Sequence, residues 1–496
     1  MKISYIKSFM LAGLIAFASS SCKKVLEPEL EYAVDGTRLS TITDFERVLN
    51  GAYGGMRSGN YYNFMYLNGA DVSTDNLVET SASLGNNRTL AQWQFNTGTG
   101  EIASAWIGPY SVINQANSVL DNIENLVEQT PGQKNRIKGQ ALAVRALGHF
   151  DLMRYFAASY ERNSSELGVV IKLRSEADFP ARVTVKESYD QIYQDLTEAE
   201  ELLGSIDKAI NAGSRRIRMD INAVRALRAR VSLYAGDWQD AKDYATKVID
   251  NSGIALSNIG VYGAALTSNA IQEPTSFQAV WFDDFNNSAE TIFAVAFNVG
   301  QGGPGFFPND GLNAFTVSED WKGLFGSSPT NDVRYNITYD PSASPSTNSY
   351  LKYSGRYDAS TVSIPRNGNV DVKVFRMAEM YLIRAEANFN LGLDAEARDD
   401  VRTLRGNRIQ GYNAASDNVV DILGEVQLER RKELVGEGHR WFDARRYQLG
   451  FDREVTGDCT STAPECVLPA GDKRFILPIP LGEMDANSNM VQNPGW

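Results

Sequence analysis

The chain has 496 residues, of which 43% are hydrophobic and 22% charged, as is typical of a folded, water-soluble protein. Its 48 basic side chains are outnumbered by 61 acidic ones, giving a formal net charge of −13. This balance argues against nucleic acid or an anionic membrane surface as the main partner, because both require a basic footprint. Only 2 His and 3 Cys are available for metal, thiol or imidazole chemistry, whereas 22 Tyr, 22 Phe and 7 Trp supply aromatic surface. The composition therefore favours a binding protein.

The N-terminus has the pattern of a secretory signal. Lys2 and Lys7 precede an apolar run at 9–18, and three serines lead to Cys22. The run is too short to span a bilayer well, so we expect residues 1–21 to be a cleaved signal peptide. Cys22 stands where a bacterial lipoprotein carries its lipid, and residues 22–40 would form a lipidated tether. The alternative is a plain cleaved signal followed by an incidental cysteine.

The other two cysteines are Cys459 and Cys466. An exported protein meets an oxidising compartment, so a small-loop disulfide between them is expected, with two idle thiols as the alternative. A metal site would need more ligands than this region supplies.

Helical periodicity dominates from about residue 44 to 250, and two internal repeats in the sequence predict paired helices. The pentapeptide Ala-Val-Arg-Ala-Leu occurs at 143–147 and again at 223–227. A small–glycine–small spacing also recurs, with one set at Ala229, Gly236 and Ala241 and the other at Ala385, Gly392 and Ala397. A small residue admits a close neighbour, the glycine ends the first helix, and the last alanine opens the contact face of the second. This is the packing of tetratricopeptide-like helix pairs, with two ordinary helical hairpins as the alternative.

The character of the chain changes between about 251 and 371, where Gly, Asn, Ser and Pro become frequent. Only 291–297 is expected to form a buried strand there, and the rest is expected to form long loops. Helices are expected again at 375–405 and 422–449. We therefore predict a mainly α fold with little β, as a single domain over 41–496. Its helical scaffold would span about 41–250 and 372–450, with a loop-rich insertion at about 251–371.

No motif for catalysis is present: HExxH, GxSxG, a phosphate loop and a dinucleotide fingerprint are all missing. His149 lies among core-facing helical residues and His439 in a charged cluster, so structural roles are expected for both. Asp283 and Asp284 sit among aromatic residues and could form half of a glycosidase carboxylate pair, or a calcium site. We expect neither, and predict no catalytic residue, no metal and no cofactor.

A dense charged cluster runs from Glu429 to Asp443, in which Glu429, Glu433 and Glu437 recur every four residues. Such arrays are usually ion-pair networks that fix helix packing. Arg430, Arg440 and Asp443 are the expected partners.

Ligand binding is expected at aromatic residues in stretches rich in Asn, Gly and Asp. An exposed ring offers a flat face to the C–H face of a sugar, while nearby amides and carboxylates bond its hydroxyls. The candidate ligand-binding residues are Tyr61, Tyr62, Trp93, Trp281, Phe282, Asp283, Phe285 and Trp321.

Several segments, in order along the chain, carry a family resemblance. They are the helical segment 139–156 with Gly-Val-Val at 168–170, FRMAEMYLIRAEA at 375–387, the charged segment 429–446, and the C-terminal LPIP at 477–480 with Glu483 and QNPGW at 492–496. From Cys22 to its last residue, the chain resembles the SusD/RagB family of outer-membrane nutrient-binding lipoproteins of Bacteroidetes.

The resemblance implies a mostly α-helical fold with tetratricopeptide-like pairs and display on the exterior of the outer membrane through the lipid on Cys22. It also implies that the protein binds an oligosaccharide without cleaving it and delivers it to a SusC-like, TonB-dependent barrel. The motifs are fold signatures, so they transfer no binding residue. Two other classes stay open at this point: a glycoside hydrolase that uses a carboxylate pair, and a repeat scaffold that binds only protein.

Overall fold

The computed structural model describes residues 39–81, 83–206, 209–211, 215–260, 276–282, 290–298, 303, 314–341, 349–356, 368–460, 463 and 465–496. The described residues are mainly helical, as the sequence predicts, and the strands among them form three two-stranded ladders. No described helix is long and apolar enough to cross a membrane.

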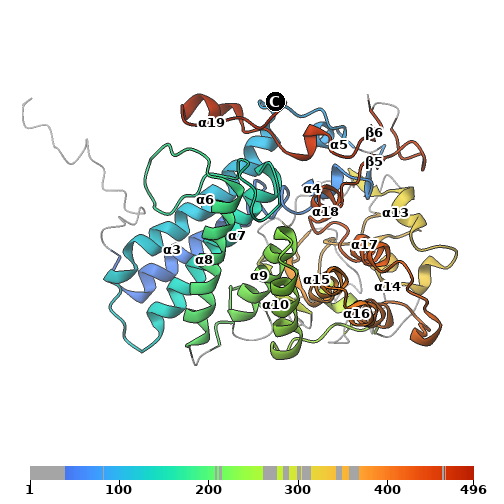
Figure 1. Ribbon diagram of the computed structural model, residues 1–496, viewed down its shortest axis with the longest axis horizontal. Helices are drawn as coiled ribbons and strands as arrows, with labels where there is room; N and C mark the ends of the chain where they lie inside the picture. Colours follow the sequence, from blue (N-terminus) through green and yellow to red (C-terminus); the bar gives the residue numbers. More distant parts are fainter. Residues whose placement is uncertain are drawn as a thin grey trace, which may run out of the picture.

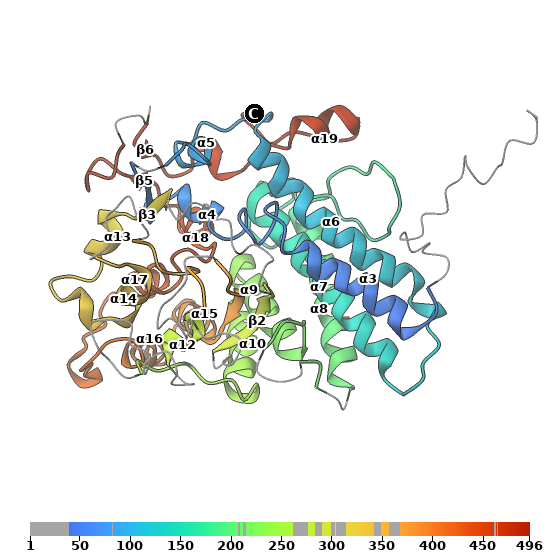
Figure 2. The same ribbon diagram turned by 180° about the vertical axis from the view of Figure 1, so that it is seen from behind.

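A row of long helices forms the scaffold (Figures 1 and 2). Each helix packs on the next in the order α3, α6, α7, α8, α9, α10 and α15, and α15 in turn contacts α16 and α17. Their bounds are α3 (Ile42–Gly55), α6 (Gly100–Asn122), α7 (Gln133–Phe156), α8 (Val185–Gly204), α9 (Ile221–Ala235), α10 (Trp238–Asn251), α15 (Met377–Asn390), α16 (Asp394–Gly406) and α17 (Ile422–Glu433). The row begins with α3 and α6 on the left of Figure 1 and ends with α16 and α17 on the right.

The helix pairs predicted from the repeated small–glycine–small spacing are present. Helices α9 and α10 form one pair and α15 and α16 the other, and α10 packs directly on α15. Gly236 (φ 74°) and Gly392 (φ 75°) lie in the left-handed region just after the first helix of each pair, a conformation that stops a helix at little cost only for glycine. The four alanines of this repeated spacing are completely buried between the helices: Ala229, Ala241, Ala385 and Ala397.

The region after α10 differs in part from the prediction. The expected strand is β2 (Thr291–Val295), which pairs antiparallel with β4 (Val372–Arg376). Since β4 leads directly into α15, that helix begins at Met377 rather than at Phe375. The described parts of the region also contain short elements where loops were expected. They are α12 (Phe277–Phe282), β3 (Phe315–Val317), α13 (Glu319–Gly323) and α14 (Val333–Thr338), and β3 pairs with β1 (Leu77–Glu79).

The predicted helix at 422–449 is two helices, α17 and α18 (Arg440–Arg446). Between them the chain turns through two glycines in the left-handed region, Gly436 (φ 71°) and Gly438 (φ 77°). A Cβ atom on Gly438 would lie 2.3 Å from the backbone oxygen of Tyr66, so this turn can approach the N-terminal half only as glycine. Short elements surround it: α4 (Gly69–Val72), α5 (Arg88–Ala91), and β5 (Phe451–Asp452) paired with β6 (Val467–Leu468). Cys459 and Cys466 form a disulfide beside this ladder.

The glutamates of the charged cluster form a buried ion-pair network. Glu433 is bonded by Arg376 at 2.9 Å and Arg408 at 3.0 Å, and the three side chains are at most 1% exposed. Glu437 pairs with Arg376 and Lys352, both at 2.7 Å, and Glu429 pairs with Arg334 and Arg405. Burial alone would raise the pKa of Glu429, but the neighbouring cations, Arg334 first, hold it at about 2. The network therefore fixes α17 against segments far away in the sequence.

The expected partners were only partly right. Arg430 does pair with Asp443, at 2.9 Å, but Arg440 pairs instead with Asp75, at 2.7 Å. None of the three glutamates takes its partner from within the charged segment 429–443.

The C-terminal segment returns to the N-terminal helices. Leu477 donates its N–H to the backbone oxygen of Tyr155, and the Asn493 side chain donates to the backbone oxygen of Phe156. The short helix α19 (Leu481–Ala486) then lies beside the start of α6, at the top of Figure 1.

Candidate functional site

The predicted aromatic platforms are not exposed. The six candidate rings that the structure describes are at most 3% exposed: Tyr61, Tyr62, Trp93, Trp281, Phe282 and Trp321. The prediction that they present open faces to a ligand is therefore wrong. Asp283 and Phe285, together with Asp284 and Cys22, lie outside the described residues.

The physical reason is that other parts of the protein pack over these rings and also bond the polar ends of Tyr61, Tyr62 and Trp93. Tyr61 and Tyr62 both donate their hydroxyls to Asp151 on α7, at 2.6 and 2.8 Å. Trp93 donates to the backbone oxygen of Ser73 at 2.7 Å. Trp281 and Trp321 lie on the short helices α12 and α13 rather than in loops.

Both histidines are buried, as expected for structural roles. Burial lowers the pKa of His149 to about 3, and its neutral ring accepts the backbone N–H of Lys172 at 3.1 Å. Burial also lowers the pKa of His439 well below its ordinary value. Within the described parts of the chain, no three His, Cys, Asp or Glu side chains are grouped as metal ligands.

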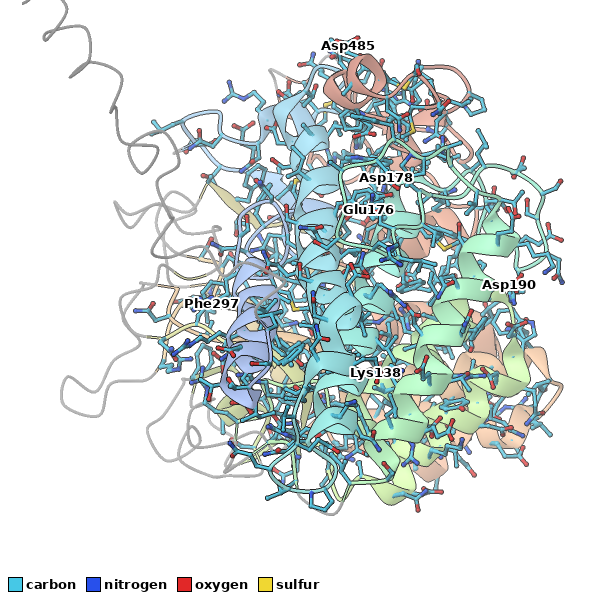
Figure 3. All side chains as sticks on the ribbon, turned by 90° about the vertical axis from the view of Figure 1, so that its left-hand side faces the viewer. Lys138, Glu176, Asp178, Asp190, Phe297 and Asp485 are labelled. Carbon is cyan, nitrogen blue, oxygen red and sulfur yellow. A yellow bond between two sulfur atoms is a disulfide. The ribbon has the colours of Figure 1, made fainter. Side chains whose placement is uncertain are left out.

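A cavity of about 400 Å³ lies between α6, the segment 170–180 and α19, and we call it the α6 cavity. Its apolar lining residues are Trp106, Ile107, Tyr110, Ile113, Val170 and Pro180. Its polar lining residues are Ser111, Asn114, Asn117, Lys172, Glu176, Asp178, Glu483 and Asn487. Figure 3 looks at this side of the molecule, with Glu176 and Asp178 on the segment beside α6 and Asp485 above them on α19.

Helix α6 supplies the floor because its apolar side chains recur at helical spacing. Trp106 and Tyr110 are one turn apart, and their ring centroids are 4.9 Å from each other. Phe156 supports Trp106 edge-on, at 5.0 Å. Each floor ring also has its polar end fixed: the Trp106 indole donates to Glu483 at 3.3 Å, and the Tyr110 hydroxyl donates to the backbone oxygen of Val170 at 2.9 Å.

Pro109 lies inside α6, next to this floor. Proline has no N–H, so the carbonyl of Ala105 loses its ordinary helical partner. The hydroxyl of Tyr66 replaces that partner and donates to the Ala105 oxygen at 2.7 Å. The break in the helical ladder is thus compensated from the neighbouring segment.

The segment 170–180 is held in place at both ends and in the middle. The Asn117 amide donates to the backbone oxygen of Lys172 and the Asn487 amide to that of Pro180, both at 3.0 Å. Within the segment, the Lys172 ammonium forms an ion pair with Asp178 and donates to the backbone oxygen of Glu176 at 3.0 Å. The wall of the cavity is therefore preformed.

The cavity combines the half-buried ring of Tyr110 and the exposed side chain of Ile107 with carboxylates and amides around them, while Trp106, only 4% exposed, supports this floor from below. This combination suits a ligand that has both apolar C–H faces and many hydroxyls. Sequence reasoning missed these residues because it searched for aromatics in loops. The available signal was Trp106, Tyr110 and Asn114, spaced four apart on one face of a helix.

Comparison with known proteins defines the class of this protein. A model described as "SusD family" matches residues 328–496, and one described as "Starch-binding associating with outer membrane" matches residues 30–233. A solved SusD superfamily protein from Bacteroides vulgatus superimposes with a TM-score of 0.76, at 26% identity over 92% of this chain and 99% of that one. The chain belongs to the SusD-like proteins.

Individual relatives agree with this assignment. A SusD-like protein of Formosa agariphila is 24% identical, over 96% of this chain and 95% of its own length. The starch-binding protein SusD of Bacteroides thetaiotaomicron is 32% identical over 28% of this chain and 24% of its own. A putative sugar binding protein from Bacteroides vulgatus has the same fold, with a TM-score of 0.74 and 27% identity over 92% of this chain and 99% of that one.

Proposed function

We propose that this protein is a glycan-binding lipoprotein of the outer membrane, which captures oligosaccharides at the α6 cavity and delivers them to a SusC-like, TonB-dependent transporter. The family assignment supports binding without cleavage at the outer membrane, since the matching model and relatives are named for starch or sugar binding. The signal pattern that ends at Cys22 supports export and a lipid anchor, and display on the exterior is inferred from the family resemblance. The observation that carries the site is the apolar floor of Tyr110 and Ile107, supported from below by Trp106, beneath a rim of carboxylates and amides.

The proposed function requires the cavity only to bind a sugar, not to catalyse a reaction. A sugar ring placed over Tyr110 and Ile107 removes apolar surface from water, while Glu483 and Asn114 are positioned to bond its hydroxyls. Because the wall segment is already fixed, little conformational entropy is lost on binding.

The test uses the unlipidated chain, residues 23–496, and a panel of oligosaccharides measured by isothermal titration calorimetry. We expect at least one oligosaccharide to bind, and Tyr110→Ala to weaken its binding by about tenfold or more, as the loss of an aromatic platform does. The comparison variant is Trp238→Ala, because Trp238 lines a different cavity of about 510 Å³ at the turn between α9 and α10. We expect it to bind as the wild type does.

Two results would contradict the proposed site. Binding that survives Tyr110→Ala would place the sugar elsewhere, and loss of binding in Trp238→Ala alone would move it to the cavity beside α9. Thermal unfolding of both variants separates loss of binding from loss of fold.

The anchor and the partner require separate experiments. We expect Cys22→Ser to release the protein from the membrane fraction. We also expect the wild type to co-purify with a large β-barrel encoded beside it. A protein that stays soluble with Cys22 intact, or that purifies without such a barrel, would contradict this part of the proposal.

A further inference from the structure

We infer that the α6 cavity selects neutral, hydroxyl-rich sugars and rejects sugars that carry a carboxylate or sulfate group. This inference rests on the proposed function and narrows its ligand class. Three carboxylates line the cavity, from Glu176, Asp178 and Glu483, against the single ammonium of Lys172. That ammonium is already paired with Asp178, so it is not available to an anionic ligand.

The amide nitrogens of two other lining residues, Asn117 and Asn487, are also engaged. The amide of Asn117 donates to the backbone of Lys172, and its oxygen accepts from Arg145 at 3.1 Å. Arg145 is in turn bonded through two nitrogens to Asp195, both at 2.8 Å. The Asn487 amide donates to the backbone oxygen of Pro180. The lining therefore offers a ligand mainly acceptors.

A sugar hydroxyl can donate to a carboxylate, and such charge-assisted bonds are among the stronger ones in proteins. A carboxylate or sulfate on the sugar can only accept, so it would face like charge from Glu176 and Glu483. Arg174 lies 4.0 Å from Glu176, but its side chain is 70% exposed and does not line the cavity, so it offsets only part of this charge. The Glu176 side chain is 56% exposed, so its part of this repulsion is screened by salt.

The test compares hexasaccharides of glucose, galactose and mannose, each in its neutral, C6-oxidised and sulfated form, by calorimetry on residues 23–496. We expect both acidic forms to bind at least tenfold more weakly than their neutral parent at low salt, which is about 1.4 kcal/mol. This difference in affinity between the acidic and neutral forms should narrow when the salt concentration is raised to about 0.5 M.

A charge reversal at the rim tests the cause. Glu176→Lys should narrow the gap between neutral and acidic forms to about threefold, because it changes the charge balance of the lining by two. Glu201→Lys makes the same change at an exposed position of α8 outside the lining, and it should leave the gap unchanged.

The outcomes separate the two claims. An acidic form that binds as well as its parent, with binding lost in Tyr110→Ala, overturns the inference and keeps the proposed function. An unchanged difference in affinity in Glu176→Lys also overturns the inference. If no hexasaccharide binds, or if Tyr110→Ala has no effect on any of them, the proposed function fails and the inference fails with it.

Discussion

Glu433 lies at the centre of the buried ion-pair network, and neutralising it tests whether that network holds the C-terminal half together. Its carboxylate receives bonds from Arg376 and Arg408 and is completely buried. Glu433→Gln keeps the shape and one acceptor oxygen but removes the negative charge. Arg376 keeps Glu437 and Glu290, and Arg408 keeps Glu290, so the variant leaves about one buried positive charge without compensation.

Breaking a buried pair from one side costs about 3–5 kcal/mol, because the remaining charge cannot be solvated. The matched control is Glu425→Gln on the same helix. The Glu425 side chain is 31% exposed, and its partner Arg405 also pairs with Asp417 and Glu429. A pair this exposed contributes less than about 1 kcal/mol.

The assay is urea unfolding followed by circular dichroism, with the change in midpoint converted to free energy through the slope. The neighbouring arginines, Arg408 first, overcome the effect of burial and hold the pKa of Glu433 well below its ordinary value. The contribution of Glu433 to the free energy of unfolding is therefore complete above the ordinary carboxyl pKa. It is lost only as the pH falls toward the lowered pKa of the folded protein. The loss of stability in Glu433→Gln should accordingly be the same at pH 7 and pH 5. A loss within 1 kcal/mol of that of Glu425→Gln would refute the reasoning.

Two further predictions concern the N-terminal half. Burial raises the pKa of Asp71 to about 6, so the folded protein binds a proton that the unfolded chain releases, and this stability is lost as the pH rises from about 4 through 6. In urea unfolding, the difference in stability between Asp71→Asn and the wild type should shift by about 2 kcal/mol in favour of the variant from pH 4 to pH 7, and parallel pH profiles would contradict this. Tyr66→Phe should cost about 1–3 kcal/mol, because it leaves the Ala105 carbonyl unpaired. Adding Pro109→Ala should recover part of that loss by restoring a helical N–H, and additive losses in the double variant would count against this account.

The helix pairs could be predicted because their signal is local. Ala229 and Gly236, like Ala385 and Gly392, act within one helix and its turn, and the structure places them as their spacing indicates. The position of β4 could not be read in the same way. Its residues 372–376 run without a break into the apolar pattern of α15, and only the pairing with β2 distinguishes strand from helix there.

The burial of the aromatics could not be predicted for a related reason. Tyr61 and Tyr62 stand in a polar stretch without helical period, and the carboxylate that receives both hydroxyls, Asp151, is about ninety residues away. The same holds for the charged cluster, where the partners of Glu433 come from β4 and from the residues after α16. Sequence spacing identifies a side chain that needs a partner, but not which distant segment provides it.

The two environments of aromatic rings and carboxylates in this protein explain why composition alone could not locate the site. At Asp151, two tyrosines and Arg154 surround one carboxylate, and every group is buried, so the arrangement is complete without a ligand. At the α6 cavity, Glu483 receives two long bonds, 3.3 Å from Trp106 and 3.4 Å from Asn487, and the rim carboxylate of Glu176 lies 4.0 Å from Arg174 and remains exposed to solvent. Unused acceptor capacity beside an apolar floor, rather than the number of aromatics, therefore distinguishes a binding surface from a packed core.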